Sequence, residues 1–476
     1  MAMGALLLVD LAIRARDLNV MYTDGGMFSR AEICRLATTI WNWSFHFGSG
    51  SWGYQAMLFG IAGVLALSLL AGFETRWAAI GSWLMLLSIH HRVPPILSGA
   101  ESLLRMLLFW AMFLPLERVW SLDGWLDKRR RGALTDGVES HVRSIASAAI
   151  LLQMGLVYLF SAIFKSNTVW FRGEALAGIL AHDFYASPPA AYLLQFPRLL
   201  IGMTWATFVV EWAAPVLLFF PRGTARLRLG IIAALAAMHV GIGLCLEVGL
   251  FSVVSVAGLT LFLPAEFWNS CLLARFVRKP QSVTQLTEPG QHLAKKRPPL
   301  FYATQGLCLI ALIYVLAVNL NSLPNHLLAP MALERWRPLA RGLGLSQRWG
   351  MFESIPSKDG WYVACAKLNN GTEVDLLRHG APVDWKKPEF PARLYPNHYW
   401  QKLFREMAYD DEQGFQLLRA PVADFLCRNW NERNTPEKQV AEFEFIYCTV
   451  DKAKAKELWP ARILRERLVH LDLSDR

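Results

Sequence analysis

Charged residues are scarce in this chain and unevenly placed. Asp, Glu, Lys and Arg make up 18% of its 476 residues, whereas 54% are hydrophobic. Between Tyr54 and Phe267 long apolar runs contain almost no charge, and beyond Asn321 charged and apolar residues alternate. A soluble multidomain protein interrupts its apolar runs with charge at roughly every helical turn, so the composition excludes an ordinary soluble enzyme. It indicates a helical membrane part followed by a water-soluble tail.

Metal and redox motifs are also missing. The seven cysteines have no Cys-x-x-Cys spacing, so we predict neither a metal site nor a dithiol redox centre. If the tail lies in an oxidising compartment, one disulfide among Cys365, Cys427 and Cys448 is an option, with one thiol left over. The sequence also lacks a phosphate-binding loop, a dinucleotide fingerprint and a Ser-His-Asp order, which argues against those enzyme classes.

The formal net charge of +10 does not indicate a nucleic-acid partner, because no recognition motif accompanies it. The basic residues cluster in short loops between apolar runs, where they face lipid headgroups and set orientation. The basic loops 127–143, 221–228 and 272–299 are separated by pairs of predicted helices and therefore fall on one side, which the positive-inside rule makes cytoplasmic. The tail is then expected outside the cytoplasm, in a multi-pass protein of the cell's inner (plasma) membrane.

The apolar runs predict eight or nine membrane helices. Met1 to Ile13 is too short for a bilayer crossing, which needs about 20 residues. Either this segment packs as a partial helix, or the natural start lies upstream, which is the alternative we favour. The fold class is therefore mainly α: a polytopic bundle over 1–320 and a soluble α/β domain over 321–476. The clear runs are 54–71, 78–89, 103–120, 145–164, 199–220, 227–246, 248–267 and 300–320.

The tail combines strand and helix patterns. Residues 361–366 and 372–377 are strand-like and flank Asn369-Asn370-Gly371, whose Asn-Gly step favours a tight hairpin turn. Charged and apolar residues alternate along 441–450, which predicts a third strand. We predict helices at 397–407 and 452–468.

Ionisable residues inside a membrane are costly, so each needs a partner or a function. Lys165 ends the fifth helix, where it is either a snorkelling interfacial residue or a base desolvated by neighbouring aromatic residues that include Trp170. Glu211 lies in the middle of a span, as a functional group or as a structural partner for Arg198, Arg222 or Lys165. His239 lies inside its helix and Glu247 at the following bend. Glu101 and Arg105, four residues apart, are expected to form an intrahelical pair.

Several local motifs occur in a characteristic order along the chain. They are Tyr22-Thr-Asp-Gly-Gly-Met-Phe-Ser-Arg30, Trp120-Ser-Leu-Asp-Gly124, Tyr158 to Gly173, His239 with Gly249-Leu-Phe251-Ser252, and in the tail Gln347-Arg-Trp-Gly-Met-Phe352, Asp359-Gly-Trp-Tyr362 and Val374-Asp-Leu376. With these motifs the chain resembles the HTTM (horizontally transferred transmembrane) family, whose best understood relative is the vitamin K-dependent gamma-carboxylase of animals.

The resemblance implies a quinol of the vitamin K type as cofactor. In the carboxylase a lysine in the matching stretch deprotonates the quinol, oxygen converts it to an epoxide, and the strong base formed removes a γ-proton from glutamate, to which CO2 adds. Lys165 is then the expected base and His239 a second catalytic residue, with Glu211, Trp170, Glu247 and Glu101 in the surrounding pocket. Ala100 stands where the carboxylase has a further functional histidine, which puts glutamate carboxylation in question.

Three functions are weighed. The first is a quinol-linked enzyme that modifies a peptide or small substrate. The second is a non-catalytic membrane factor that assists maturation or export of a secreted peptide. A transporter ranks behind both, because neither an inverted repeat nor paired broken helices is apparent. An enzyme predicts that Lys165, His239 and Glu211 converge on a lipid-accessible cavity. A scaffold predicts that Lys165 points into headgroups and that Phe and Trp fill the space.

Overall fold

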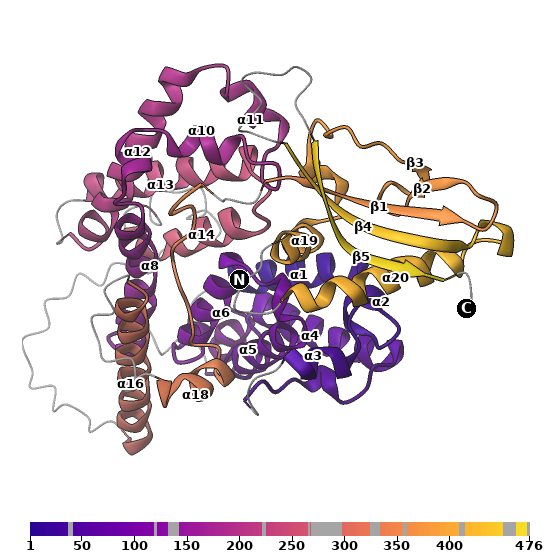
Figure 1. The fold of residues 1–476 in the computed structure, drawn as a ribbon. Helices are drawn as coiled ribbons and strands as arrows, with labels where there is room; N and C mark the ends of the chain where they lie inside the picture. The colour runs from indigo at the N-terminus through magenta and orange to yellow at the C-terminus, as the bar shows by residue number, and fades with distance from the viewer. Residues whose placement is uncertain are drawn as a thin grey trace, which may run out of the picture.

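The computed structural model describes most of the chain. Helices dominate it, and one antiparallel sheet lies near the C-terminus (Figure 1). The described residues are 1–36, 41–118, 121–131, 142–220, 225–264, 267, 298–323, 334–355, 359–408, 415–450 and 463–473.

Five helices are long and apolar enough to cross a membrane. They are α4 (Trp52–Ala71), α8 (Ile145–Phe164), α12 (Pro197–Leu217), α13 (Ala225–Cys245) and α16 (Pro299–Asn321). In α8, 67% of the apolar window is buried, against 22% in α12, α13 and α16. α8 is therefore the central helix, and the others turn apolar side chains outward as a lipid-facing surface requires. These helices make the chain a multi-pass membrane protein.

The predicted count of eight or nine spans is not confirmed. α5 (Thr75–Arg92), α6 (Gly99–Ala111) and α14 (Phe251–Leu259) coincide with predicted runs but fall outside the five. The run predicted at 103–120 leaves the α-helix at Ala111, and Pro115 follows. Proline has no N–H for the helical ladder and clashes with the preceding turn, so the helix does not continue through it.

The first helix, α1 (Ala2–Arg16), packs along α4. A Cβ added to Gly4 would lie 2.7 Å from the Cα of Leu70, so the two backbones meet at a contact that only glycine allows. α1 therefore belongs to the helical core even though it is short for a bilayer crossing. The remaining helices are α2 (Leu18–Tyr22), α3 (Arg30–Leu36), α7 (Leu122–Arg131), α9 (Thr168–Phe171), α10 (Ala175–Leu180), α11 (Pro188–Leu193) and α18 (Arg337–Gly342).

The tail contains a five-stranded antiparallel sheet in the order β3-β2-β1-β4-β5. β1 (Trp361–Leu368) and β2 (Glu373–Asp375) form the predicted hairpin, and Gly371 has the positive φ, 83°, that its turn requires. The predicted third strand is β4 (Val440–Val450), and the helix predicted at 397–407 is α19 (His398–Ala408). The other elements of the sheet and its helices are β3 (Ala381–Pro382), β5 (Ile463–Asp472) and α20 (Arg419–Asn431).

Two predictions for the tail are corrected. The helix predicted at 452–468 is wrong over its described part, because residues from Ile463 form β5; residues 452–462 lie outside the described residues. β5 pairs with β4 from Val450 to Glu442. Its backbone forms the hydrogen bonds that the edge of β4 would otherwise lack, and this pairing prevails over the helical sequence pattern. The optional disulfide is also absent from this structure: Cys365, Cys427 and Cys448 are all free.

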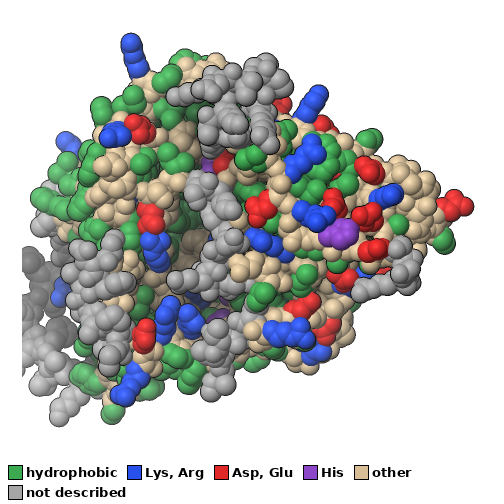
Figure 2. All heavy atoms as spheres, in the orientation of Figure 1, with side chains coloured by type: hydrophobic (Ala, Val, Ile, Leu, Met, Phe, Trp, Pro, Cys, Tyr) green, Lys and Arg blue, Asp and Glu red, His purple; other side chains and the backbone are tan. Residues whose placement is uncertain are grey.

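The tail and the helices share a core. Tyr362 and Phe404 belong to the same apolar cluster as Met21 and Ile89 of the helical part. α19 and α20 lie between the sheet and the N-terminal helices (Figure 1). Trp349, which precedes the sheet, is buried in the main helical cluster. In Figure 2 hydrophobic side chains gather over the helical part and charged ones over the sheet. The domain boundary near residue 320 thus stays a prediction.

Candidate functional site

A buried ion pair joins the central helix to α12. The Nζ of Lys165, directly after α8, lies 2.8 Å from Oε1 and 2.9 Å from Oε2 of Glu211. It also donates to the Oγ of Ser161 at 2.5 Å, one turn back on the same face of α8. Lys165 is 4% exposed and Glu211 5%. The ammonium is therefore turned inward, and of the three partners considered for Glu211 it is Lys165 that the structure supplies.

Trp170 covers this pair. Its ring centroid lies 5.2 Å from the Nζ of Lys165, within the range of a cation–π contact. Its indole N–H donates to the carbonyl of Phe352 at 3.0 Å, and Asn167 donates to the carbonyl of Glu353 at 2.7 Å. The segment before the sheet therefore packs against the end of α8 that carries Lys165. The structure thus brings the tail and Lys165 to the same end of the helical bundle.

A second polar pair lies beside the first. The Nε2 of His239, on α13, is 3.1 Å from the hydroxyl of Tyr158, and both residues are buried. Tyr158 lies seven residues before Lys165, on the same face of α8. The charge of Lys165 acts on His239 and that of Glu211 on Tyr158, so the two pairs form one electrostatic cluster. The Nδ1 of His239 has no hydrogen-bond partner within the described part of the chain.

Glu101 lies elsewhere. Its Oε2 accepts from the Ser98 backbone N–H at 2.7 Å in a capping box at the start of α6, and its Oε1 lies 3.6 Å from Arg14. The intrahelical pair predicted with Arg105 does not form: that guanidinium donates instead to the carbonyl of Gly344 at 2.8 Å. Glu101 therefore belongs to an ion network around Arg14, apart from Lys165.

Glu247 is exposed and lines a cavity of about 440 Å³ between the helices and the tail. Lys165, Glu211 and His239 do not line this cavity. Two of its wall residues touch their cluster, however: the Phe251 ring packs 5.5 Å from the His239 ring, and Phe352 accepts the indole N–H of Trp170. The cavity wall further includes Tyr185, Arg348, Met351, His398, Gln401, Lys402 and Arg405.

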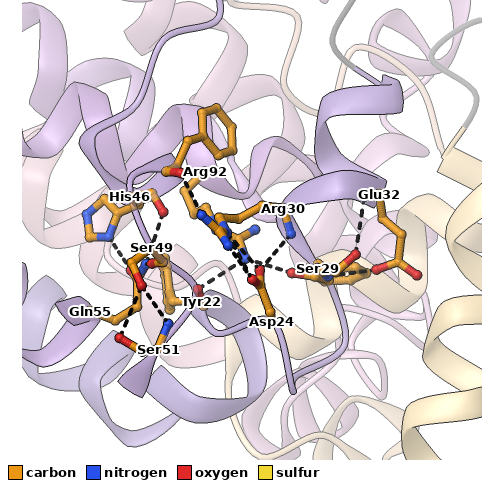
Figure 3. A network of polar contacts seen from close by, with 12 residues as sticks. Tyr22, Asp24, Ser29, Arg30, Glu32, His46, Ser49, Ser51, Gln55 and Arg92 are labelled. Carbon is orange, nitrogen blue, oxygen red and sulfur yellow. Dashed lines mark hydrogen bonds and ion pairs between the residues drawn. The ribbon is translucent and has the colours of Figure 1, made fainter. Parts of the chain in front are cut away.

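The segment between α2 and α4 holds a separate polar network with the end of α5 (Figure 3). Arg92 is fully buried, and its Nη2 donates to the carbonyls of Tyr22 and Phe28 at 3.1 and 2.7 Å. Arg30 pairs with Asp24 at 2.8 Å, and this contact lowers the pKa of that carboxyl below its usual range. The Arg92 guanidinium therefore holds the segment 22–30 against α5, and the Arg30–Asp24 pair stabilises the segment internally.

Acidic residues also meet where the loop after α10 contacts the tail. The backbone N–H of Asp183 donates to the Oδ1 of Asp359 at 2.7 Å, and Lys387 lies 2.5 Å from the Asp183 carboxylate. His182 faces Asp359 at 3.7 Å. Burial, followed by the charge of Asp359, raises the pKa of Asp183 to about 6.

This raised pKa predicts a pH dependence of stability. Because about 6 exceeds the ordinary 3.8, the contribution of Asp183 is complete below pH 3.8 and is lost as pH rises through 6. We expect Asp183→Asn to raise the melting temperature of the detergent-solubilised protein at pH 7.5, by an amount worth no more than about 3 kcal/mol, and to change it little at pH 4. Asp384→Asn, on an exposed carboxylate, is the control. An equal shift at both pH values would contradict the assignment.

No three His, Cys, Asp or Glu side chains among the described residues come together as a metal site. Of the predicted residues, the structure gathers Lys165, Glu211, His239 and Trp170, and separates Glu101 and Glu247 from them. Sequence reasoning missed Tyr158 as a member of the cluster. The helical spacing of seven from Lys165 was the available signal.

The helical region resembles a known protein family. A model of the HTTM domain matches residues 49–268, a range that includes Lys165, Glu211, His239 and Tyr158. No solved structure matches the chain.

Proposed function

Because this chain carries an HTTM domain, we propose that it is a membrane-embedded, quinol-linked enzyme in which Lys165 is the base. The observation that supports the proposal is the buried cluster of Lys165, Glu211, Tyr158 and His239 inside that domain. A charged pair buried among apolar helices is costly, and replacing it with apolar residues is often neutral or stabilising. Its presence therefore favours a chemical use over a purely structural one.

Glu211 holds Lys165 in position for such a step. Its Oε1 and Oε2 lie 2.8 and 2.9 Å from Nζ in a buried pair, which fixes the place of the amino group. In this proposal Lys165 accepts the proton of a bound hydroxyl, and the carboxylate of Glu211 stabilises the ammonium that forms. Proton transfer of this kind by a positioned group contributes about 10²–10⁴-fold to a rate.

The surroundings fit a quinol hydroxyl. The Nδ1 of His239 is buried and unpartnered among the described residues, so it offers one hydrogen bond to a ligand, while the hydroxyl of Tyr158 orients the other ring nitrogen. The Phe251 and Trp170 rings supply apolar walls that exclude water. When bound, the quinol would be the reductant that O2 oxidises to the epoxide, and this oxidation would supply the strong base that removes a carbon-bound proton from the substrate. The peptide or small substrate would enter from the cavity of about 440 Å³ beside Phe251.

The test combines lipid analysis with an activity assay. We expect a quinone to copurify with the wild-type protein and added quinol to be converted to its epoxide, with Lys165→Ala lowering the rate at least about 100-fold. Lys438→Ala, on the exposed surface of the tail, should keep full activity. If wild type shows neither bound quinone nor epoxide, the enzyme proposal fails.

A non-catalytic factor for maturation or export of a secreted peptide is the second candidate. One observation favours it: Lys165, Glu211 and His239 are absent from the lining of the cavities found among the described residues, and aromatic rings pack around them. A variant that folds with apolar residues in place of Lys165 and Glu211 distinguishes the two functions. Such a variant should keep the full activity of a non-catalytic factor and should lose all activity of an enzyme.

A further inference from the structure

A second cavity lies at the other end of the central helix. It measures about 350 Å³ and is bounded by the beginnings of α5, α8 and α16 and by the segment that follows α6. Its charged lining residues are Arg76, Arg143 and Glu117. Its apolar lining includes Met112, Phe113, Leu114, Val142, Leu300 and Phe301.

This cavity lies at the opposite end of α8 from Lys165. α8 begins at Ile145, next to Arg143, and after 20 residues reaches Lys165, where the segment before the sheet packs. A helix of that length spans about 30 Å, the thickness of the hydrocarbon core. The cavity and the Lys165 cluster therefore face opposite leaflets.

Exposed aromatic residues place the cavity at headgroup depth. Phe73 and Trp77 flank the lining residue Arg76 in the sequence and are 45% and 67% exposed, and Trp125 on α7 is 54% exposed. Tryptophan gathers at membrane–water interfaces, where its ring contacts both lipid and water. Asp123 accepts from the backbone N–H groups of Glu74 and Thr75 at 2.9 Å, and so ties α7, which carries Trp125, to the start of α5.

The charges of the cavity are unbalanced. Arg76 and Arg143 are exposed, and neither has an ion-pair partner in the part of the chain that the structure describes. Glu117 is the single acidic side chain of the lining. The apolar wall from Leu300 and Phe301 continues onto the lipid-facing side of α16. A ligand that matches both parts has an anionic head and an apolar tail.

We propose that this cavity binds an anionic phospholipid, with its phosphate between Arg76 and Arg143 and its acyl chains along α16. Guanidinium groups form paired hydrogen bonds with phosphate oxygens, so two of them recognise such a headgroup better than a zwitterionic one. The proposal is independent of the chemistry at Lys165.

Native mass spectrometry of the detergent-purified full chain tests it. Phosphatidylglycerol and phosphatidylcholine with identical acyl chains are added at equal concentration. We expect the wild type to retain several-fold more phosphatidylglycerol, and Arg76→Ala/Arg143→Ala to reduce that excess at least fivefold. Arg172→Ala/Arg198→Ala removes two exposed arginines near the Lys165 end and should leave the excess unchanged.

Two further arms keep the test sharp. Arg76→Lys/Arg143→Lys retains the charges and should preserve part of the preference, which a folding defect would not allow. Equal retention of both lipids by the wild type, or an undiminished preference in the double alanine variant, would overturn the proposal. So would equal binding of soluble glycerol phosphate, because a lipid site requires the acyl chains.

Discussion

Glu211→Leu alone is expected to destabilise the folded protein by about 3–5 kcal/mol, because it leaves the Lys165 ammonium buried without its carboxylate. Lys165→Met alone is expected to cost a similar amount for the converse reason. The double variant Lys165→Met/Glu211→Leu should recover most of the loss, since two apolar side chains suit the surrounding helices. The measurement is the free energy of unfolding in mixed micelles for all four proteins.

An exposed pair serves as the matched control for this cycle. Arg467 on β5 and Glu444 on β4 lie 2.8 Å apart, and their side chains are 61% and 31% exposed. Removing both should change the free energy of unfolding by less than about 1 kcal/mol, because water screens the pair. Additive losses in the Lys165/Glu211 double variant would contradict a direct buried pair. If the double variant folds, its activity also separates the enzyme from the scaffold.

Arg14→Met is expected to loosen the tail from the helices and to cost about 3–5 kcal/mol. Arg14 is 1% exposed and lies 2.8 Å from Asp10, 3.0 Å from the Tyr22 hydroxyl and 3.6 Å from Glu101. Its guanidinium also lies 4.1 Å from the ring of Tyr399, on α19 of the tail. Without it, the buried carboxylates of Asp10 and Glu101 lose the ion-pair partner that they share.

Hydrogen exchange of the α19 backbone measures this effect. We expect faster exchange across His398–Ala408 in Arg14→Met than in the wild type, because the contacts that hold α19 against α1 weaken. Arg16→Met is the control, since Arg16 is exposed on the same helix two residues later. Unchanged exchange in α19 would show that Arg14 does not hold the tail.

Local signals predicted much of this fold. The long apolar runs predicted the five spans because a bilayer accepts only segments that satisfy their own backbone hydrogen bonds. The hairpin at Gly371 was predictable because its turn requires a positive φ. The wrong predictions concern residues whose conformation depends on segments far away in the sequence. β5 forms because it pairs with the edge of β4. Arg105 does not pair with Glu101 because its guanidinium donates to the carbonyl of Gly344.

The candidate site was only partly predictable. Lys165, Glu211 and His239 were recognisable because a polar group in an apolar membrane helix is costly and is retained only with a partner or a function. Tyr158 was missed because tyrosine is common in such helices, and only the structure shows that its hydroxyl contacts His239. Arg14 was missed because it follows the short apolar segment Met1 to Ile13, whereas in the structure α1 continues through it and its guanidinium contacts the tail.

The sequence by itself determined that this is a helical membrane protein with an α/β tail, because segment length, apolar content and turn residues act locally. Only the tertiary structure decided that Lys165 pairs with Glu211, 46 residues away, and that Glu101 serves a different network. It also decided that the tail shares its core with the helices instead of standing apart. Each of these outcomes depends on which helix faces come together, and a charge buried at such a contact takes whichever partner the packing supplies.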